Sequence, residues 1–161
     1  MNQRVQPGLV DSHLDFFLSE NRLFFSHNGQ IKPFKLLPED KMQQLEAHLN
    51  EDEEAMAALD EMRITERMGR LQQFARCRFG GNDVYPDLTD EGVFRADFHI
   101  CPLSGSCKHE GKLCKILSGP DGEEITHREK DVLLLIARGF MQKEIAAALN
   151  APLIEWHVKS T

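Results

Sequence analysis

Four cysteines are the residues of this sequence whose type and spacing best suit a chemical role. Three of them fall within residues 101–114, and the fourth precedes them in the chain. Zinc takes four soft or borderline ligands in a tetrahedron, and thiolates are among those it prefers. A four-iron iron–sulfur cluster has the same requirement for thiolates, so it is an alternative to zinc, and four reduced thiols without metal are another. The sequence predicts a metal site formed by Cys77, Cys101, Cys107 and Cys114.

The residues around these cysteines favour a structural metal over a catalytic one. Two glycines allow backbone amides to approach the sulfur atoms, three lysines offset the charge of the thiolates, and two histidines are reserve ligands. Residues 80–118 contain few apolar side chains, so we expect a bound metal to hold this stretch in place. The supporting residues are Gly105, Gly111, Lys108, Lys112, Lys115, His99 and His109.

A second group of residues, 125–149, predicts two short helices joined by a tight turn. Thr126 with Glu129 three residues later is the pattern of a capping box at a helix start. Gly139 stands where the end of a helix favours a left-handed residue. Residues 141–149 place Ile145 and Leu149 on one side of the second helix. Two helices in this arrangement are typical of DNA-binding proteins, which lay a recognition helix in the major groove.

The same residues resemble the signature of the LuxR/FixJ family of helix-turn-helix transcriptional regulators. The resemblance covers about a quarter of the chain and implies a helical DNA-binding domain that acts as a homodimer on paired half-sites of double-stranded DNA. Compared with the family, the chain ends inside the recognition helix, so we expect the domain to lack its fourth helix. The residues that carry the resemblance are Thr126, Glu129, Val132, Leu133, Leu135, Ile136, Ala137, Gly139, Lys143, Glu144, Ile145, Ala146 and Leu149.

The resemblance also implies which residues would contact DNA. Lys143 matches the family lysine that contacts a phosphate, and His157 matches a recurrent histidine of the recognition helix. Glu155, Trp156 and Lys159 fall on the side of that helix that faces the groove. A lysine on a phosphate anchors the protein without reading sequence, whereas Glu155 could accept from cytosine and Trp156 could contact thymine methyl groups. The alternative for each residue is an ordinary surface or packing role.

The elements before the cysteines are predicted to be mainly helical. Residues 11–18 form a short amphipathic piece, and residues 22–26 and 31–37 form a small hairpin around Asn28-Gly29. A helix over 41–49 follows, and Pro38 precedes it at a position where the first residue of a helix tolerates proline. We then expect one long helix, which begins at the acidic run 51–54, continues through Phe74 and ends at Gly80-Gly81. We expect the long helix to pack in the core, with a dimerisation strut as the alternative.

Composition and charge limit the function further. A chain of 161 residues with a net charge of −7 does not coat nucleic acid or an anionic membrane through bulk charge, and residues 121–161 carry more acidic than basic side chains. The longest apolar run, 132–137, is too short to span a bilayer, and the beginning of the sequence has no targeting pattern, which predicts a cytoplasmic protein with no membrane partner. No recognisable nucleophile or metalloprotease motif is present, so we expect no enzyme.

The predicted fold class is therefore mainly α, with a small hairpin and a Cys-rich knuckle before a LuxR-type helix-turn-helix. Residues 1–118 would form a sensing or oligomerisation module, and residues 119–161, beginning at the linker 119–122, would form the DNA-binding domain. This predicts a transcriptional regulator. The alternative is a metal-binding module for protein interaction, whose helix-turn-helix no longer binds DNA.

Overall fold

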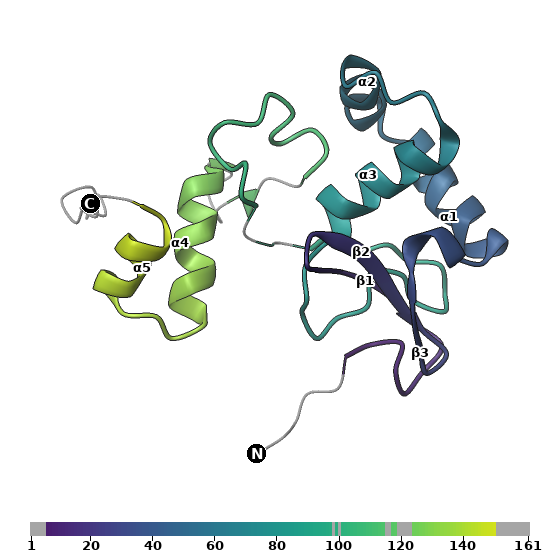
Figure 1. The fold of residues 1–161 in the computed structure, drawn as a ribbon, viewed down its shortest axis with the longest axis horizontal. Coiled ribbons are helices and arrows are strands. Elements are labelled where there is room, and N and C mark those ends of the chain that lie inside the picture. Colours follow the sequence, from purple (N-terminus) through teal and green to yellow (C-terminus); the bar gives the residue numbers. More distant parts are fainter. Residues whose placement is uncertain (1–5, 98, 100, 115–116, 119–123, 151–161) are drawn as a thin grey trace. The chain divides into compact units, whose positions relative to one another are not determined.

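The computed structural model describes residues 6–97, 99, 101–114, 117–118 and 124–150. The chain divides into two compact units, Met1–Lys115 and Ile116–Thr161, and each is described by itself (Figure 1). The predicted linker over residues 119–122 lies outside the described residues. In the part of the chain that the structure describes, no helix is both long and apolar enough to cross a membrane.

The first unit begins with an antiparallel sheet in the order β1-β2-β3, formed by Leu14–Ser19, Arg22–His27 and Gln30–Pro33. The predicted hairpin is present as β2 and β3, although its second strand ends at Pro33 and not at residue 37, because Phe34–Leu36 form a 3-10 helix. Asn28 and Gly29, between the two strands, have positive φ angles of 50° and 73°. Glu20 and Asn21, between β1 and β2, repeat this geometry with φ of 48° and 63°. Paired left-handed residues twist a two-residue turn in the sense that adjacent antiparallel strands require. The amphipathic piece predicted over 11–18 is largely strand β1.

Three α-helices follow the sheet, after a short 3-10 helix, Phe34–Leu36. The first, α1, spans Glu39–Asn50 and confirms the predicted helix, although Pro38 is its N-cap and not its first helical residue. Helix α2 spans Glu53–Glu61, and its N-cap Asp52 accepts a hydrogen bond from the backbone nitrogen of Ala55 at 2.9 Å. Helix α3 spans Arg67–Phe79 and ends at Gly80.

The single long helix predicted from residue 51 to Gly80 is wrong, because the chain turns between α2 and α3. Arg63 adopts a left-handed φ of 57° just after the end of α2. The guanidinium of Arg70, on α3, donates to the carbonyl oxygen of Ile64 at 3.0 Å and to the carboxylate of Asp60 at 2.6 Å. The turn is therefore stabilised by a residue of the next helix, and it allows both helices to face one core.

Aromatic side chains from the sheet and the helices meet in the core of the first unit. The ring of Phe16, on β1, lies 5.8 Å from that of Phe34 and 6.0 Å from that of Phe79, on α3. Phe74 contacts Phe79 edge to face with centroids 5.8 Å apart, a favoured arrangement for aromatic pairs. Downstream, the backbone of Leu88 pairs with that of Leu14 through two hydrogen bonds of 3.0 Å, so the segment after α3 returns to β1.

The second unit contains two short strands and two helices in its described residues. Strands β4 (Leu117–Ser118) and β5 (Glu124–Ile125) pair antiparallel, and helices α4 (His127–Ala137) and α5 (Gln142–Ala148) follow. The buried apolar side chains of this unit come from α4, α5 and the residue after α5; they are Leu135, Ile145, Ala146 and Leu149.

The fold class predicted from the sequence, mainly α, is wrong. The described residues combine five α-helices with a three-stranded antiparallel sheet whose inner face supplies part of the core, so helix and sheet both build the first unit. The predicted Cys-rich knuckle is not shown either, since the chain over 101–114 is a series of turns.

Candidate functional site

The four cysteines come from two places in the first unit. Cys77 lies on α3, and the other three lie on the segment 101–114, which is called the cysteine segment below. All four are half-buried and none forms a disulfide. The pKa of the Cys77 thiol is raised to about 11, mainly by burial, with smaller contributions from the charges of Cys114, Cys101 and Cys107. The structure therefore brings the four predicted ligands into one neighbourhood.

Tight turns shape the cysteine segment. The backbone nitrogen of Ser104 donates to the carbonyl oxygen of Cys101 at 3.0 Å, and that of Cys107 donates to Leu103 at 3.0 Å. The carboxylate of Glu110 then accepts from the hydroxyl of Ser104 and from the backbone nitrogen of Gly105, both at 3.0 Å. These bonds are local, so they fix the shape of the turns without a hydrophobic core.

Two glycines are predicted to let a backbone amide approach a sulfur atom, and one of them, Gly111, does so. Gly111, with a φ of 85°, directs its nitrogen to the sulfur of Cys114 at 3.4 Å. Gly105 has a similar φ of 81°, but its amide faces Glu110. On α3, the side-chain nitrogen of Gln73 donates to the sulfur of Cys77 at 3.1 Å. Two of the four sulfurs thus accept a hydrogen bond from a nearby donor.

Arg78 fastens the cysteine segment to α3. Its Nε donates to the carbonyl oxygen of Leu113 at 2.7 Å, and its Nη2 donates to that of Lys112 at 3.0 Å. The same guanidinium pairs with the carboxylate of Asp52 at 2.8 Å and lies over the ring of Phe74 at 4.9 Å. Because Arg78 is next to Cys77, and Leu113 is next to Cys114, these bonds hold the two cysteines' backbones near each other.

The side chains as they stand do not form a coordination sphere. Within residues 6–97, 99, 101–114, 117–118 and 124–150, no group of three or more His, Cys, Asp or Glu residues is placed to hold a metal ion. Nδ1 of His109, one of the two reserve ligands, lies 3.5 Å from a carboxylate oxygen of Glu61 at the end of α2. The metal site at the four cysteines stays a prediction.

The two helices predicted over residues 125–149 are present, with the predicted capping box at the start of the first. The backbone nitrogen of Glu129 donates to the hydroxyl of Thr126 at 3.2 Å, and the carboxylate of Glu129 accepts from the backbone nitrogen of Thr126 at 2.9 Å. These two bonds are the predicted capping box of α4. Gly139 has a φ of 84° in the turn that follows, and α5 begins within a residue of its predicted start.

The residues predicted to contact DNA are only partly described. Lys143 lies on α5 and is exposed to solvent. Glu155, Trp156, His157 and Lys159 fall in residues 151–161, outside the described residues. The guanidinium of Arg128, on α4, donates to the carbonyl oxygen of Leu149, which fastens the end of α5 to α4. Of the residues predicted to contact DNA, Lys143 is therefore the one that lies in the described part of the chain.

A cluster of buried carboxyl groups in the first unit was missed by sequence reasoning. Asp15 is on β1, and Asp87 and Asp97 are on the segment after α3; all three are at most 6% exposed. Asp87 accepts from the backbone nitrogen of Phe16 at 2.6 Å, and Asp97 from that of Gly81 at 2.9 Å. Burial raises the pKa of Asp15 and of Asp97 to about 7 in each case, and it also raises the pKa of Asp87 well above its ordinary value. No local pattern marks these residues, because they are far apart in the sequence.

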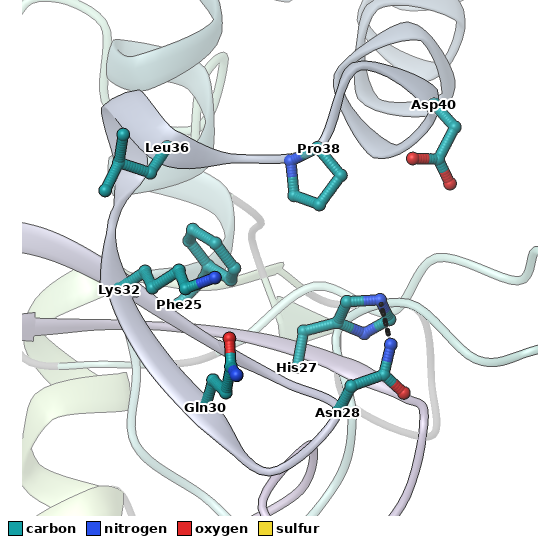
Figure 2. Close-up of a pocket in the computed structure, with 8 residues that line it drawn as sticks. All are labelled: Phe25, His27, Asn28, Gln30, Lys32, Leu36, Pro38 and Asp40. Carbon is teal, nitrogen blue, oxygen red and sulfur yellow. Dashed lines mark hydrogen bonds between the residues drawn. The ribbon is translucent and has the colours of Figure 1, made fainter.

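The β2–β3 hairpin and the start of α1 enclose a surface pocket of about 390 Å³. Figure 2 shows that His27 and Asn28 approach it from the hairpin turn and Pro38 and Asp40 from the helix, with Asn28 hydrogen-bonded to the ring of His27 at 3.0 Å. None of the predicted site residues lines it. Its lining residues are Phe25, His27, Asn28, Gln30, Lys32, Leu36, Pro38 and Asp40.

Comparisons of the chain with protein-family models, with curated proteins and with solved structures found no match.

Proposed function

We propose that the chain is a cytoplasmic DNA-binding transcriptional regulator that acts through α4, α5 and the residues that follow them. The observation that supports this most directly is the α4–turn–α5 pair. It combines a capping box, a left-handed glycine in the turn and a short second helix with an exposed lysine. These are the features on which the resemblance to LuxR/FixJ regulators depends, and two short helices so joined suit docking against the major groove.

In this proposal, one residue anchors the protein on the DNA backbone and others contact the bases. Lys143, near the N-terminus of α5, would contact a phosphate, since the positive end of the helix dipole and the ammonium group both attract one. Glu155, Trp156, His157 and Lys159 would contact the groove from a recognition helix. Because this part of the chain is not basic, affinity would come from paired half-sites bound by a homodimer and from specific contacts.

The test uses random duplexes, because the operator is unknown. Duplexes enriched over repeated rounds of binding to the full chain are labelled, and their affinity is measured by fluorescence anisotropy at several salt concentrations. Lys143→Ala should weaken binding to every enriched duplex and reduce the slope of log affinity against log salt by about 1. Lys35→Ala, which removes an exposed lysine from the first unit, is the charge-matched control and should leave the slope unchanged.

Two results would contradict the proposal. One is the absence of any enriched sequence after selection at low salt. The other is an enriched sequence whose affinity and salt slope are the same for Lys143→Ala as for the wild type.

A metal-binding module for protein interaction, with a helix-turn-helix that no longer binds DNA, is the second candidate. It is favoured by four large apolar side chains of α4 and the following turn that are between 43% and 72% exposed. Such side chains on one short segment are typical of a surface that binds protein. Purification of the chain with a stoichiometric protein partner, together with no DNA affinity, would support this candidate. The four side chains are Leu133, Ile136, Phe140 and Met141.

A further inference from the structure

We propose that Cys77 of α3 and the three cysteines of the cysteine segment bind one zinc ion as four thiolates. The site lies in the first unit and its argument does not use the helix-turn-helix, so it goes beyond the DNA-binding proposal and can hold or fail independently of it. Its role would be structural: the zinc would join the cysteine segment to α3.

The backbone already holds the two parts of the proposed site together. Arg78 donates to the carbonyl oxygens of Lys112 and Leu113, so Cys77 and Cys114 are each one residue from the same buried contact. The backbone nitrogen of Asp97 also donates to the carbonyl oxygen of Arg78 at 2.9 Å, which brings the chain leading to Cys101 beside the same turn of α3. A zinc site needs ligands from separate elements at one point, and these bonds meet that need.

The bonds from Arg78 bring the backbones of the two parts together, although the sulfurs are not at coordinating positions in the described residues. Rotation of the side chains about Cα–Cβ and closure of the turns over 101–107 would bring them onto one ion. Gln73 and Gly111 donate to two of the sulfurs, at 3.1 Å and 3.4 Å, and such donors around the ligands stabilise thiolates bound to metal. Zinc would displace the four thiol protons, which pass to solvent, and no electron is transferred.

Apart from the two bonds from Arg78, the cysteine segment has few contacts that hold it in place. Among residues 101–114, Leu113 is the single buried side chain, at 1% exposed, and Leu103 is 60% exposed. Its side-chain contacts with α2 are long: Nδ1 of His109 lies 3.5 Å, and the ammonium of Lys112 3.7 Å, from the carboxylate of Glu61, which is exposed. Contacts of this kind to an exposed carboxylate contribute little to stability. A segment with so small a core is typically held by disulfides or by a metal, and none of the four cysteines forms a disulfide.

The direct test is elemental analysis of the full chain, purified without chelator and with zinc in the growth medium. We expect about one zinc per chain. Cys77→Ser should reduce the zinc content several-fold, whereas Lys35→Ala, at an exposed residue outside the cysteine segment, should leave it unchanged. A zinc content of a small fraction of one equivalent would overturn the proposal, and so would iron in its place with the visible absorbance of an iron–sulfur cluster.

A second measurement needs no variant, so it stands if Cys77→Ser does not fold. The native wild-type chain is alkylated at its thiols, with and without a chelator, and the modified thiols are counted by mass spectrometry. We expect all four thiols to be protected until the chelator is added, and all four then to react at least tenfold faster. Equal rates with and without the chelator would overturn the proposal.

Discussion

The buried carboxyl groups of Asp15 and Asp97 should make the first unit less stable as the pH rises. Each has a pKa of about 7 in the folded chain against an ordinary value of 3.8, mainly because burial penalises the charged form. The folded chain therefore binds more protons than the unfolded chain between these values. The stability that this contributes is present in full below the unfolded pKa and is lost as the pH rises toward the folded pKa.

The size of the effect follows from the same shifts. A carboxyl that is ionised only in the unfolded chain costs about 1.4 kcal/mol of stability for each unit of pH. The negative charge of Asp97 raises the pKa of Asp15, so the two carboxyl groups do not ionise independently. They therefore titrate as one coupled pair. Counting the pair as one full proton between about pH 5 and pH 7, Asp15 and Asp97 should account for roughly 3 kcal/mol of lost stability, in addition to any loss from Asp87.

Urea unfolding followed by far-ultraviolet circular dichroism at a series of pH values measures this loss. The double variant Asp15→Asn, Asp97→Asn keeps side chains that can accept from Gln6 and from the backbone of Gly81, but it removes both titrating groups. Its stability should fall less than that of the wild type over the same range, and the loss that remains comes from Asp87, whose pKa burial keeps raised. Asp40→Asn, at an exposed carboxyl on α1, is the matched control and should follow the wild type. A wild-type stability that is flat or rises from pH 5 to pH 7, relative to the double variant, would refute the reasoning.

Two further predictions concern single hydrogen bonds and single glycines. Thr126→Ala removes the hydroxyl that accepts from Glu129 and should cost the second unit about 1 kcal/mol, while Thr126→Ser should cost less; hydrogen exchange of the α4 amides measures both. Gly8→Ala should destabilise the first unit by about 2 kcal/mol or more, because its φ is 76° and an added Cβ would lie 2.4 Å from the carbonyl oxygen of Ser26. Gly139→Ala meets open space and should cost only the strain of its φ, about 1 kcal/mol by thermal unfolding, so equal losses at the two glycines would contradict this account.

Features set by neighbouring residues could be predicted from the sequence. Thr126 and Glu129 make their capping box within one turn of helix, and Asn28-Gly29 adopts left-handed angles because few other residues do so at low cost. Neither feature depends on residues elsewhere in the chain, which is why the sequence predicts the hairpin turn and the start of α4.

Features set by distant residues could not be predicted. The chain breaks between α2 and α3 where Arg70 binds the carbonyl oxygen of Ile64, a contact that the apolar periodicity of the sequence does not reveal. The sequence predicts only an amphipathic piece where strand β1 lies, and it does not reveal that the polar side chain of Asp15 is buried there. Its partners Asp87 and Asp97 come from residues after α3, so the cluster exists only in the folded chain.

Arg78 links three segments of the first unit through one buried charge. Its guanidinium, whose side chain is 3% exposed, binds the N-cap carboxylate of α2 and two carbonyl oxygens of the cysteine segment. If the cysteine segment opened alone, the guanidinium would keep its ion pair with Asp52 but lose two carbonyl acceptors, and buried donors left without an acceptor are costly. The cysteine segment and the start of α2 should therefore open together as one cooperative unit. A chemical change at the thiols should then also alter the stability of the start of α2.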